Sequence, residues 1–144
     1  MKSESVPSGW SALLEIQRVT HMTLHALAAR LAEFDLTASE INALASLADD
    51  RPRTVSELAA ATGGRPTTLT SVLDRLERRG YVTRGRRAGD RRSVLIELTD
   101  PGRRAAAAVR RAFAELESRA LGGLPADAIT GLRTALRALG GEPA

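Results

Sequence analysis

The sequence lacks cysteine and long apolar runs, and it has few aromatic residues. Without cysteine, the chain cannot form a disulfide framework, a thiolate metal site, a catalytic thiol or a thiol-based redox sensor. Aromatic residues make up 3% of its 144 residues, so leucine, alanine, valine and isoleucine must fill most of the core. No apolar run approaches the roughly 18 residues of a membrane-spanning helix. Because the segment from Met1 to Gly9 is polar, we expect neither a signal peptide nor a membrane anchor, and a cytoplasmic location.

Lysine is also nearly absent: Lys2 is the only one, so arginine supplies almost all of the positive charge. The formal net charge of +4 is unevenly distributed, with −4 in residues 1–50, +7 in residues 51–92 and +1 in residues 93–144. A positive centre between acidic or nearly neutral flanks indicates a module that binds a polyanion and is carried by other elements.

Patterns typical of catalysis are missing as well. Gly63 and Gly64 are not followed by the lysine that a phosphate-binding loop requires. The serine, histidine and acidic residues lie on segments that the fold already explains. We therefore expect a protein that is not an enzyme and that binds no cofactor.

Both ends of the chain have the spacing of long amphipathic helices. Residues 8–34 carry a stripe at Leu13, Ile16, Leu24, Leu27, Leu31 and Phe34. An alanine-rich helix, which Thr99 is expected to cap, ends at Gly122, and a last helix covers residues 125–139 with a stripe at Ile129, Leu132, Leu136 and Leu139. These stripes are too long for a small central domain to cover, so we expect a homodimer in which the terminal helices meet.

The centre of the chain contains two sequences typical of helix starts, Thr37-Ala38-Ser39-Glu40 and Thr54-Val55-Ser56-Glu57. A third helix is expected from Pro66 to Arg79, ended by Gly80.

Two strands follow the third helix, at 81–84 and 93–98, with a glycine- and arginine-containing loop between them. This order is that of a winged helix-turn-helix. The predicted fold is mainly α with a small β-hairpin wing: a winged helix-turn-helix domain flanked by dimerisation helices.

The helix after Pro66 has two chemically different faces. Its apolar stripe is expected in the core and consists of Leu69, Val72, Leu73 and Leu76. The opposite face carries short polar residues near the helix N-terminus and charges further on. Short polar side chains allow a helix to approach base edges in the major groove. Asp74 and Arg78 are four residues apart, so a helix-stabilising ion pair is as plausible there as a functional role.

At this point the sequence resembles the MarR family of bacterial transcription regulators. The resemblance is carried by residues 70–82, by the wing sequence Asp90-Arg91-Arg92-Ser93 and by residues 98–102. It implies a homodimer, a recognition helix in the major groove and a wing beside the minor groove of double-stranded DNA. Many family members carry arginine where this chain has Ser71, so that contact is either missing or made by Arg65 or Arg75.

We expect two groups of residues to contact DNA. The recognition-helix group is Arg65, Thr67, Thr68, Thr70, Ser71 and Arg75. The wing group is Arg84, Arg86, Arg87, Asp90, Arg91 and Arg92. Ordinary solvated surfaces are the alternative for both groups. Phosphate repels a carboxylate, so we hypothesise that Asp90 pairs with a neighbouring arginine and orients it.

The resemblance also implies a small aromatic or anionic effector, held in a cleft lined by the first, second and fifth helices. The candidate residues are Arg18, His21 and His25. The two histidines are four residues apart, but two ligands are too few for a usual zinc site, and we expect no metal. Polar residues of the dimer interface are the alternative reading. Trp10 is expected to anchor that interface.

Together these patterns predict a homodimeric transcription regulator that binds a specific sequence of double-stranded DNA. We expect it to be a repressor that a small effector releases from DNA. Its segments are a dimerisation helix (1–36), a DNA-binding domain (37–99) and C-terminal dimerisation helices (100–144). A constitutive architectural protein without an effector, and a winged-helix module that binds proteins, remain the alternatives.

Overall fold

The computed structural model describes residues 6–86 and 94–141. The wing residues Arg87, Asp90, Arg91 and Arg92 lie outside these ranges, and so does the side chain of Arg86. The chain forms two compact units, one up to Arg110 and one from Arg111 onward, and helix α5 runs from the first into the second.

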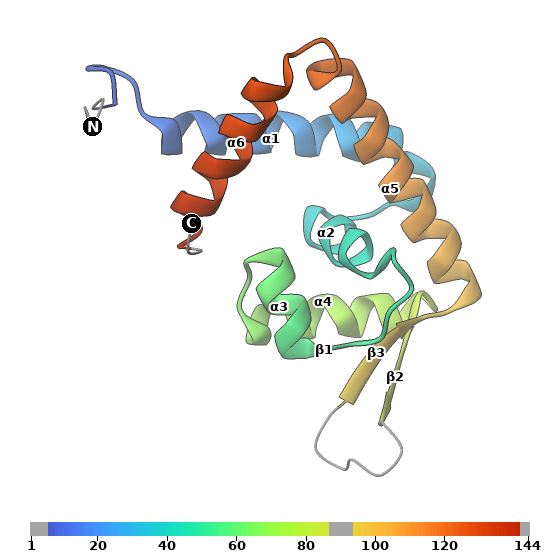
Figure 1. The fold of residues 1–144 in the computed structure, drawn as a ribbon. Helices are drawn as coiled ribbons and strands as arrows, with labels where there is room; N and C mark the ends of the chain where they lie inside the picture. Colours follow the sequence, from blue (N-terminus) through green and yellow to red (C-terminus); the bar gives the residue numbers. More distant parts are fainter. Residues whose placement is uncertain (1–5, 87–93, 142–144) are drawn as a thin grey trace. The chain divides into compact units, whose positions relative to one another are not determined.

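The architecture is mainly helical with one small sheet (Figure 1), which confirms the predicted fold class. The elements, in chain order, are α1 (Ala12–Arg30), the 3-10 turn η1 (Ala32–Phe34), α2 (Ala38–Leu47), β1 (Arg53–Thr54), α3 (Val55–Thr62), α4 (Pro66–Arg78), β2 (Val82–Arg86), β3 (Val94–Leu98), α5 (Asp100–Leu121) and α6 (Ala126–Leu139).

The predicted helix starts are confirmed, one of them in part. Around Thr37, both reciprocal hydrogen bonds of a capping box are present: its hydroxyl accepts from the Glu40 N–H, and the Glu40 carboxylate accepts from the Thr37 N–H. The Thr54 hydroxyl accepts from the Glu57 N–H but donates to the Glu57 carboxylate, so the return bond uses the hydroxyl instead of the backbone. The Thr99 hydroxyl accepts from Gly102 N–H at the start of α5, as expected.

The first helix is shorter than its apolar spacing predicts. α1 ends at Arg30, and the chain tightens into η1 before Asp35, whose φ of 49° lies in the left-handed region. Aspartate tolerates this region better than most residues do. The apolar spacing continues through Phe34 although the α-helix does not, so periodicity alone placed the end too late.

The sheet has three antiparallel strands in the order β1-β3-β2. Val82 pairs with Leu98 and Arg86 with Val94, so β2 and β3 run antiparallel along their full lengths. β1 was not predicted, because its two residues are too few to show any alternation of apolar and polar side chains. It pairs Arg53 with Ile96 and so joins the start of α3 to the wing.

The core lies where α2, α3 and α4 pack together against the sheet. All four residues of the predicted α4 stripe are buried, which confirms that prediction. The largest side chains that are almost fully buried are Ile41, Leu44, Leu47, Leu58, Leu73, Leu76, Ile96, Val82 and Val109. Burial of each large aliphatic side chain contributes about 1.5–3 kcal/mol.

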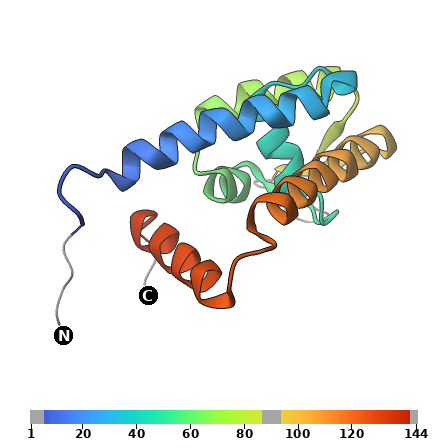
Figure 2. The same cartoon turned by 90° about the horizontal axis from the view of Figure 1, so that it is seen from above.

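The terminal helices differ from this core. No described residue of α6 is buried, and its stripe of Ile129, Leu132, Leu136 and Leu139 is 37–49% exposed. On α1 only Leu27 is buried, while Leu13, Leu14, Val19 and Met22 are exposed. Figure 2 shows α1 from above, extending away from α2–α4 towards the N-terminus. No described helix is both long enough and apolar enough to cross a membrane.

Candidate nucleic-acid interface

A tight turn between α3 and α4 brings the start of α4 to the surface. α3 ends at Thr62, and the capping residue Gly63 has a φ of 74°, a left-handed conformation that glycine adopts without strain. Arg65 is the N-cap of α4, and Pro66 occupies the first helical position, where no N–H is needed. The apolar stripe of α4 faces inward, so the opposite face is turned to solvent.

The structure places the predicted recognition-helix residues together on that solvent-facing side. Arg65, Thr67, Thr68, Thr70, Ser71 and Arg75 are all exposed. The Thr70 hydroxyl donates to the Pro66 carbonyl at 2.9 Å, so its one hydrogen is already used. Thr67 and Thr68 lie in the first turn, where no helical carbonyl stands four residues back. Their hydroxyls are therefore available to an outside partner.

The side chain of Arg84, on β2, is directed towards α4. Its guanidinium lies 2.5 Å from an Asp74 carboxylate oxygen and 3.6 Å from Glu77 Oε2, and it donates to the Thr70 carbonyl at 3.4 Å. Asp74 therefore pairs with the wing strand, whereas the sequence suggested Arg78, four residues along the same helix. This contact joins the base of the wing to the recognition helix.

A second set of polar contacts joins the turn between α4 and β2 to the start of α5. The Thr99 hydroxyl donates to the Gly80 carbonyl at 2.5 Å, and the Thr99 N–H donates to the Tyr81 carbonyl at 3.0 Å. Gly102 is required here, because a Cβ at that position would lie 1.9 Å from the Tyr81 oxygen. α5 can therefore start only in close contact with the turn after α4.

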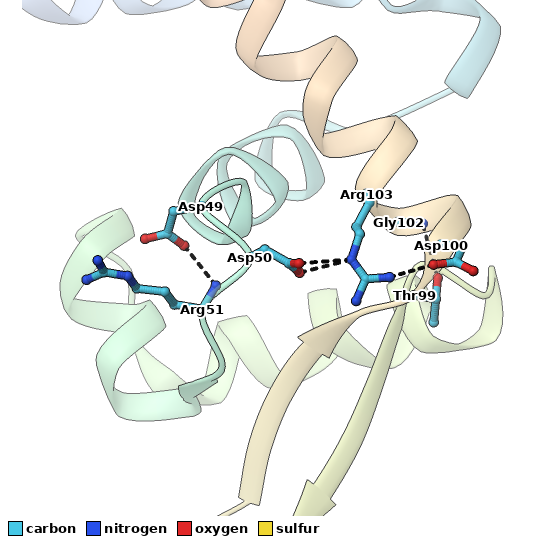
Figure 3. Close-up of polar contacts among 7 residues, drawn as sticks. All are labelled: Asp49, Asp50, Arg51, Thr99, Asp100, Gly102 and Arg103. Atoms are coloured by element: carbon cyan, nitrogen blue, oxygen red, sulfur yellow. Dashed lines mark hydrogen bonds and ion pairs between the residues drawn. The ribbon is translucent and has the colours of Figure 1, made fainter.

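Arg103, in the first turn of α5, links the start of this helix to the turn that follows α2 (Figure 3). Its Nε lies 3.0 Å from Asp50 Oδ2, and its Nη1 lies 2.5 Å from Asp100 Oδ1. Hydrogen bonding to Asp50 is the main reason that the pKa of Arg103 is raised. The sequence gave no signal for this pair, since 53 residues separate the partners.

The candidate effector residues lie apart from the recognition helix, on the exposed surface of α1. Arg18 donates to Met22 Sδ at 3.3 Å and borders a hollow of about 320 Å³ together with Gly9, Trp10, Ser11, Leu14 and Glu15. His21 and His25 are exposed and do not line that hollow. Within the described ranges, no three histidine, aspartate or glutamate side chains are grouped as metal ligands.

A second hollow, of about 110 Å³, lies between α2 and the start of α4. Its lining consists of Ser39, Asn42, Thr62, Gly64, Arg65, Thr68, Leu69 and Val72. It shares Arg65 and Thr68 with the predicted DNA-binding face. Neither hollow corresponds to the cleft of first, second and fifth helices that the sequence led us to expect, and that cleft stays a prediction.

Comparison with known proteins gives the family of this helix-turn-helix. Residues 36–94 match the model of the MarR family. The regulator PecS of Dickeya dadantii is 39% identical over 90 residues, which are 60% of this chain and 54% of PecS. The matching segment thus spans about half the length of such curated relatives.

Solved structures extend the likeness over nearly the whole chain. CouR from Rhodococcus jostii, in a crystal structure with p-coumaroyl-CoA, is 26% identical, with a TM-score of 0.80 over 94% of this chain and 96% of CouR. AbfR, in an overoxidised form bound to DNA, is 26% identical, with a TM-score of 0.65 over 88% of this chain and 90% of AbfR. The order of the elements and the three-stranded wing sheet of this chain agree with the family match over residues 36–94. This chain carries a winged helix-turn-helix domain of the MarR family.

Proposed function

We propose that this protein is a homodimeric, DNA-binding transcription regulator that represses from a pseudo-palindromic operator and is released by a small effector. The observation that carries the proposal is the exposed first half of α4. Its short polar side chains, including the uncommitted hydroxyls of Thr67 and Thr68, face solvent, and Arg84 of the wing strand β2 contacts the same helix.

Direct readout is assigned to the N-terminal half of α4. Threonine and serine hydroxyls donate to or accept from base edges, and the threonine methyl group contacts thymine. Thr70 enters this scheme as an acceptor, because its hydroxyl hydrogen is committed to Pro66. Guanine contacts fall to Arg65 and Arg75, which are exposed at either end of this face and compensate for the absence of arginine at Ser71.

The wing has two tasks in this proposal. Arg84, held by Asp74 and Glu77, aligns the wing with α4. Arg86, Arg87, Arg91 and Arg92 supply charge to phosphates and to the minor groove, whose negative potential attracts arginine. Asp90 orients one of these arginines, as inferred from the sequence.

Dimerisation is supported by apolar surface that one chain leaves uncovered. The stripe of α6 and the exposed residues of α1 are the kind of surface that a second copy covers in an obligate dimer. A two-fold dimer presents two recognition helices to half-sites roughly 10 base pairs apart, centre to centre.

An effector acts by stabilising a dimer whose recognition helices no longer fit adjacent major grooves. CouR was crystallised with p-coumaroyl-CoA, an aromatic and anionic ligand of the class that we propose here. Because this chain has no cysteine, thiol oxidation is not its signal.

Selection of bound duplexes from a random pool tests the proposal, followed by titration of the selected duplex at two salt concentrations. We expect an enriched pseudo-palindrome and an affinity that falls steeply with salt, because arginine–phosphate contacts release counterions. Ser46→Ala is the matched control for Thr67→Val and Thr68→Val, since the Ser46 hydroxyl donates within its own helix, to Asn42. The proposal is contradicted if no sequence is enriched. It is also contradicted if Thr67→Val, Thr68→Val and Ser46→Ala all bind the selected duplex with equal affinity.

A further inference from the structure

Arg79, directly after α4, connects the recognition helix to a distant part of the chain. Its guanidinium donates to the Glu40 carboxylate at 3.1 Å and to the Asp35 carbonyl at 2.9 Å, and also to the Phe34 carbonyl. These acceptors lie 39 to 45 residues away in the sequence. Phe34 and Asp35 lie between α1 and α2, and Glu40 lies in the first turn of α2, so one side chain joins this α1–α2 junction to the end of the recognition helix.

Glu40 is an unusual partner, because it is the only charged residue among the described ones that is buried. Burial raises the pKa of its carboxyl, but donors from the Thr37 backbone, the Thr37 hydroxyl and Arg79 outweigh that effect and lower the pKa overall. The carboxylate therefore stays charged at neutral pH. A buried carboxylate that loses its cation is strongly destabilised.

The junction itself is a turn with a fixed shape. η1 ends at Phe34, and Asp35 follows in the left-handed conformation, so both carbonyls are presented to one side. A guanidinium is a planar fork with five N–H donors and can serve a carboxylate and two carbonyls at once. The ammonium group of lysine carries the same charge but lacks this planar fork. The Arg79 guanidinium carbon also lies 5.2 Å from the centre of the Tyr81 ring, and Tyr81 begins the approach to β2.

From this geometry, and resting on the proposed function, we infer that Arg79 is a positioning residue for sequence-specific DNA binding. It fixes the end of α4 against the α1–α2 junction and so sets the angle at which the recognition helix meets the groove. It does not act by contacting phosphate, since its guanidinium is engaged by three acceptors of the junction.

The test compares Arg79→Lys with Arg78→Lys, using the duplex selected by the wild-type protein and a shuffled duplex of the same length. Arg78 is the neighbouring arginine, exposed, and without a hydrogen bond or ion pair to any described residue. For Arg79→Lys we expect about a tenfold loss of affinity for the selected duplex and little change for the shuffled one, because two or more charge-assisted hydrogen bonds are lost. Arg78→Lys should leave both affinities unchanged.

Folding is checked on the same samples by thermal unfolding, and Glu40→Gln gives a second route if Arg79→Lys is not folded at the assay temperature. Glu40→Gln keeps the shape but removes the charge, and it should reduce the same specific-to-nonspecific ratio. If both variants are folded and keep the wild-type ratio, the inference is overturned. An equal loss on both duplexes also overturns it, because that is the signature of a lost phosphate contact. A wild-type protein that selects no duplex overturns the proposed function and this inference together.

Discussion

The winged helix-turn-helix lobe, formed by α2–α4 and β1–β3, buries its apolar side chains within one chain, whereas the terminal helices α1 and α6 leave most of theirs exposed. In the lobe, α2, α3, α4 and the wing sheet cover one another, and side chains such as Leu44 and Leu73 are fully buried within one chain. In α6, every described residue is exposed although its apolar spacing is equally regular. The same apolar spacing therefore specifies an internal core in α4 and an exposed stripe in α6, and we propose that a second copy of the chain covers that stripe.

The largest effect is expected on the stability of the lobe, where a single substitution in the core should lower the free energy of unfolding. Leu73→Ala should reduce the free energy of unfolding by about 3 kcal/mol, because it leaves a cavity in the core of the lobe. Urea denaturation of the purified protein measures this loss. Leu44→Ala should be destabilised to the same extent, and a loss below about 1 kcal/mol in both variants would contradict a core that is complete within one chain.

A charge placed in the apolar stripe of α6 should change the association of two chains. Leu136→Arg places a charge in the apolar stripe and is expected to weaken dimerisation at least about a hundredfold, with α6 otherwise unaffected. Sedimentation equilibrium measures the association. Arg133→Lys on the same helix preserves the charge and is the control. A dimer of wild-type strength in Leu136→Arg would show that α6 is not at the interface.

Substitution of Gly102 tests the close packing at the start of α5, the helix that leads from the lobe to the C-terminal part of the chain. Gly102→Ala should lower the free energy of unfolding by about 2 kcal/mol, since the new methyl group collides with the Tyr81 carbonyl. Gly131→Ala, in the interior of α6 with open space around its Cβ position, should instead stabilise its helix by up to about 1 kcal/mol. Thermal unfolding distinguishes the two signs.

The smallest expected effect is a pH dependence within the lobe. The pKa of the Glu40 carboxyl lies below its ordinary value of 4.5 in the folded protein, so its contribution to stability is present above that value and is lost as the pH falls through the folded pKa. Urea unfolding between pH 6 and pH 3 should therefore lose stability more steeply in the wild type than in Glu40→Gln. Parallel curves would contradict the role assigned to the charged carboxylate.

Local rules predicted the parts of the structure that depend on short sequence distances. The α4 stripe, the Thr37 capping box and the Thr99 cap involve residues at most seven positions apart, and each is present. The same rules missed β1, whose two residues carry no pattern, and they extended the first helix past Arg30.

Short-range sequence patterns could not predict the polar contacts between segments that lie far apart in the sequence. Arg79 and Glu40 are 39 residues apart, and Arg103 and Asp50 are 53 apart. Asp74 had a plausible partner four residues along its own helix, yet the folded wing brings Arg84 closer. A sequence shows which charges exist, whereas the packing of α4 against the sheet decides which of them meet.

The number of chains bound to the selected duplex, measured together with the footprint, tests the proposed dimeric DNA binding. We expect two chains per duplex and a two-fold symmetric footprint, with half-sites about 10 base pairs apart. One chain on a single asymmetric site, or binding that ignores sequence, would contradict it.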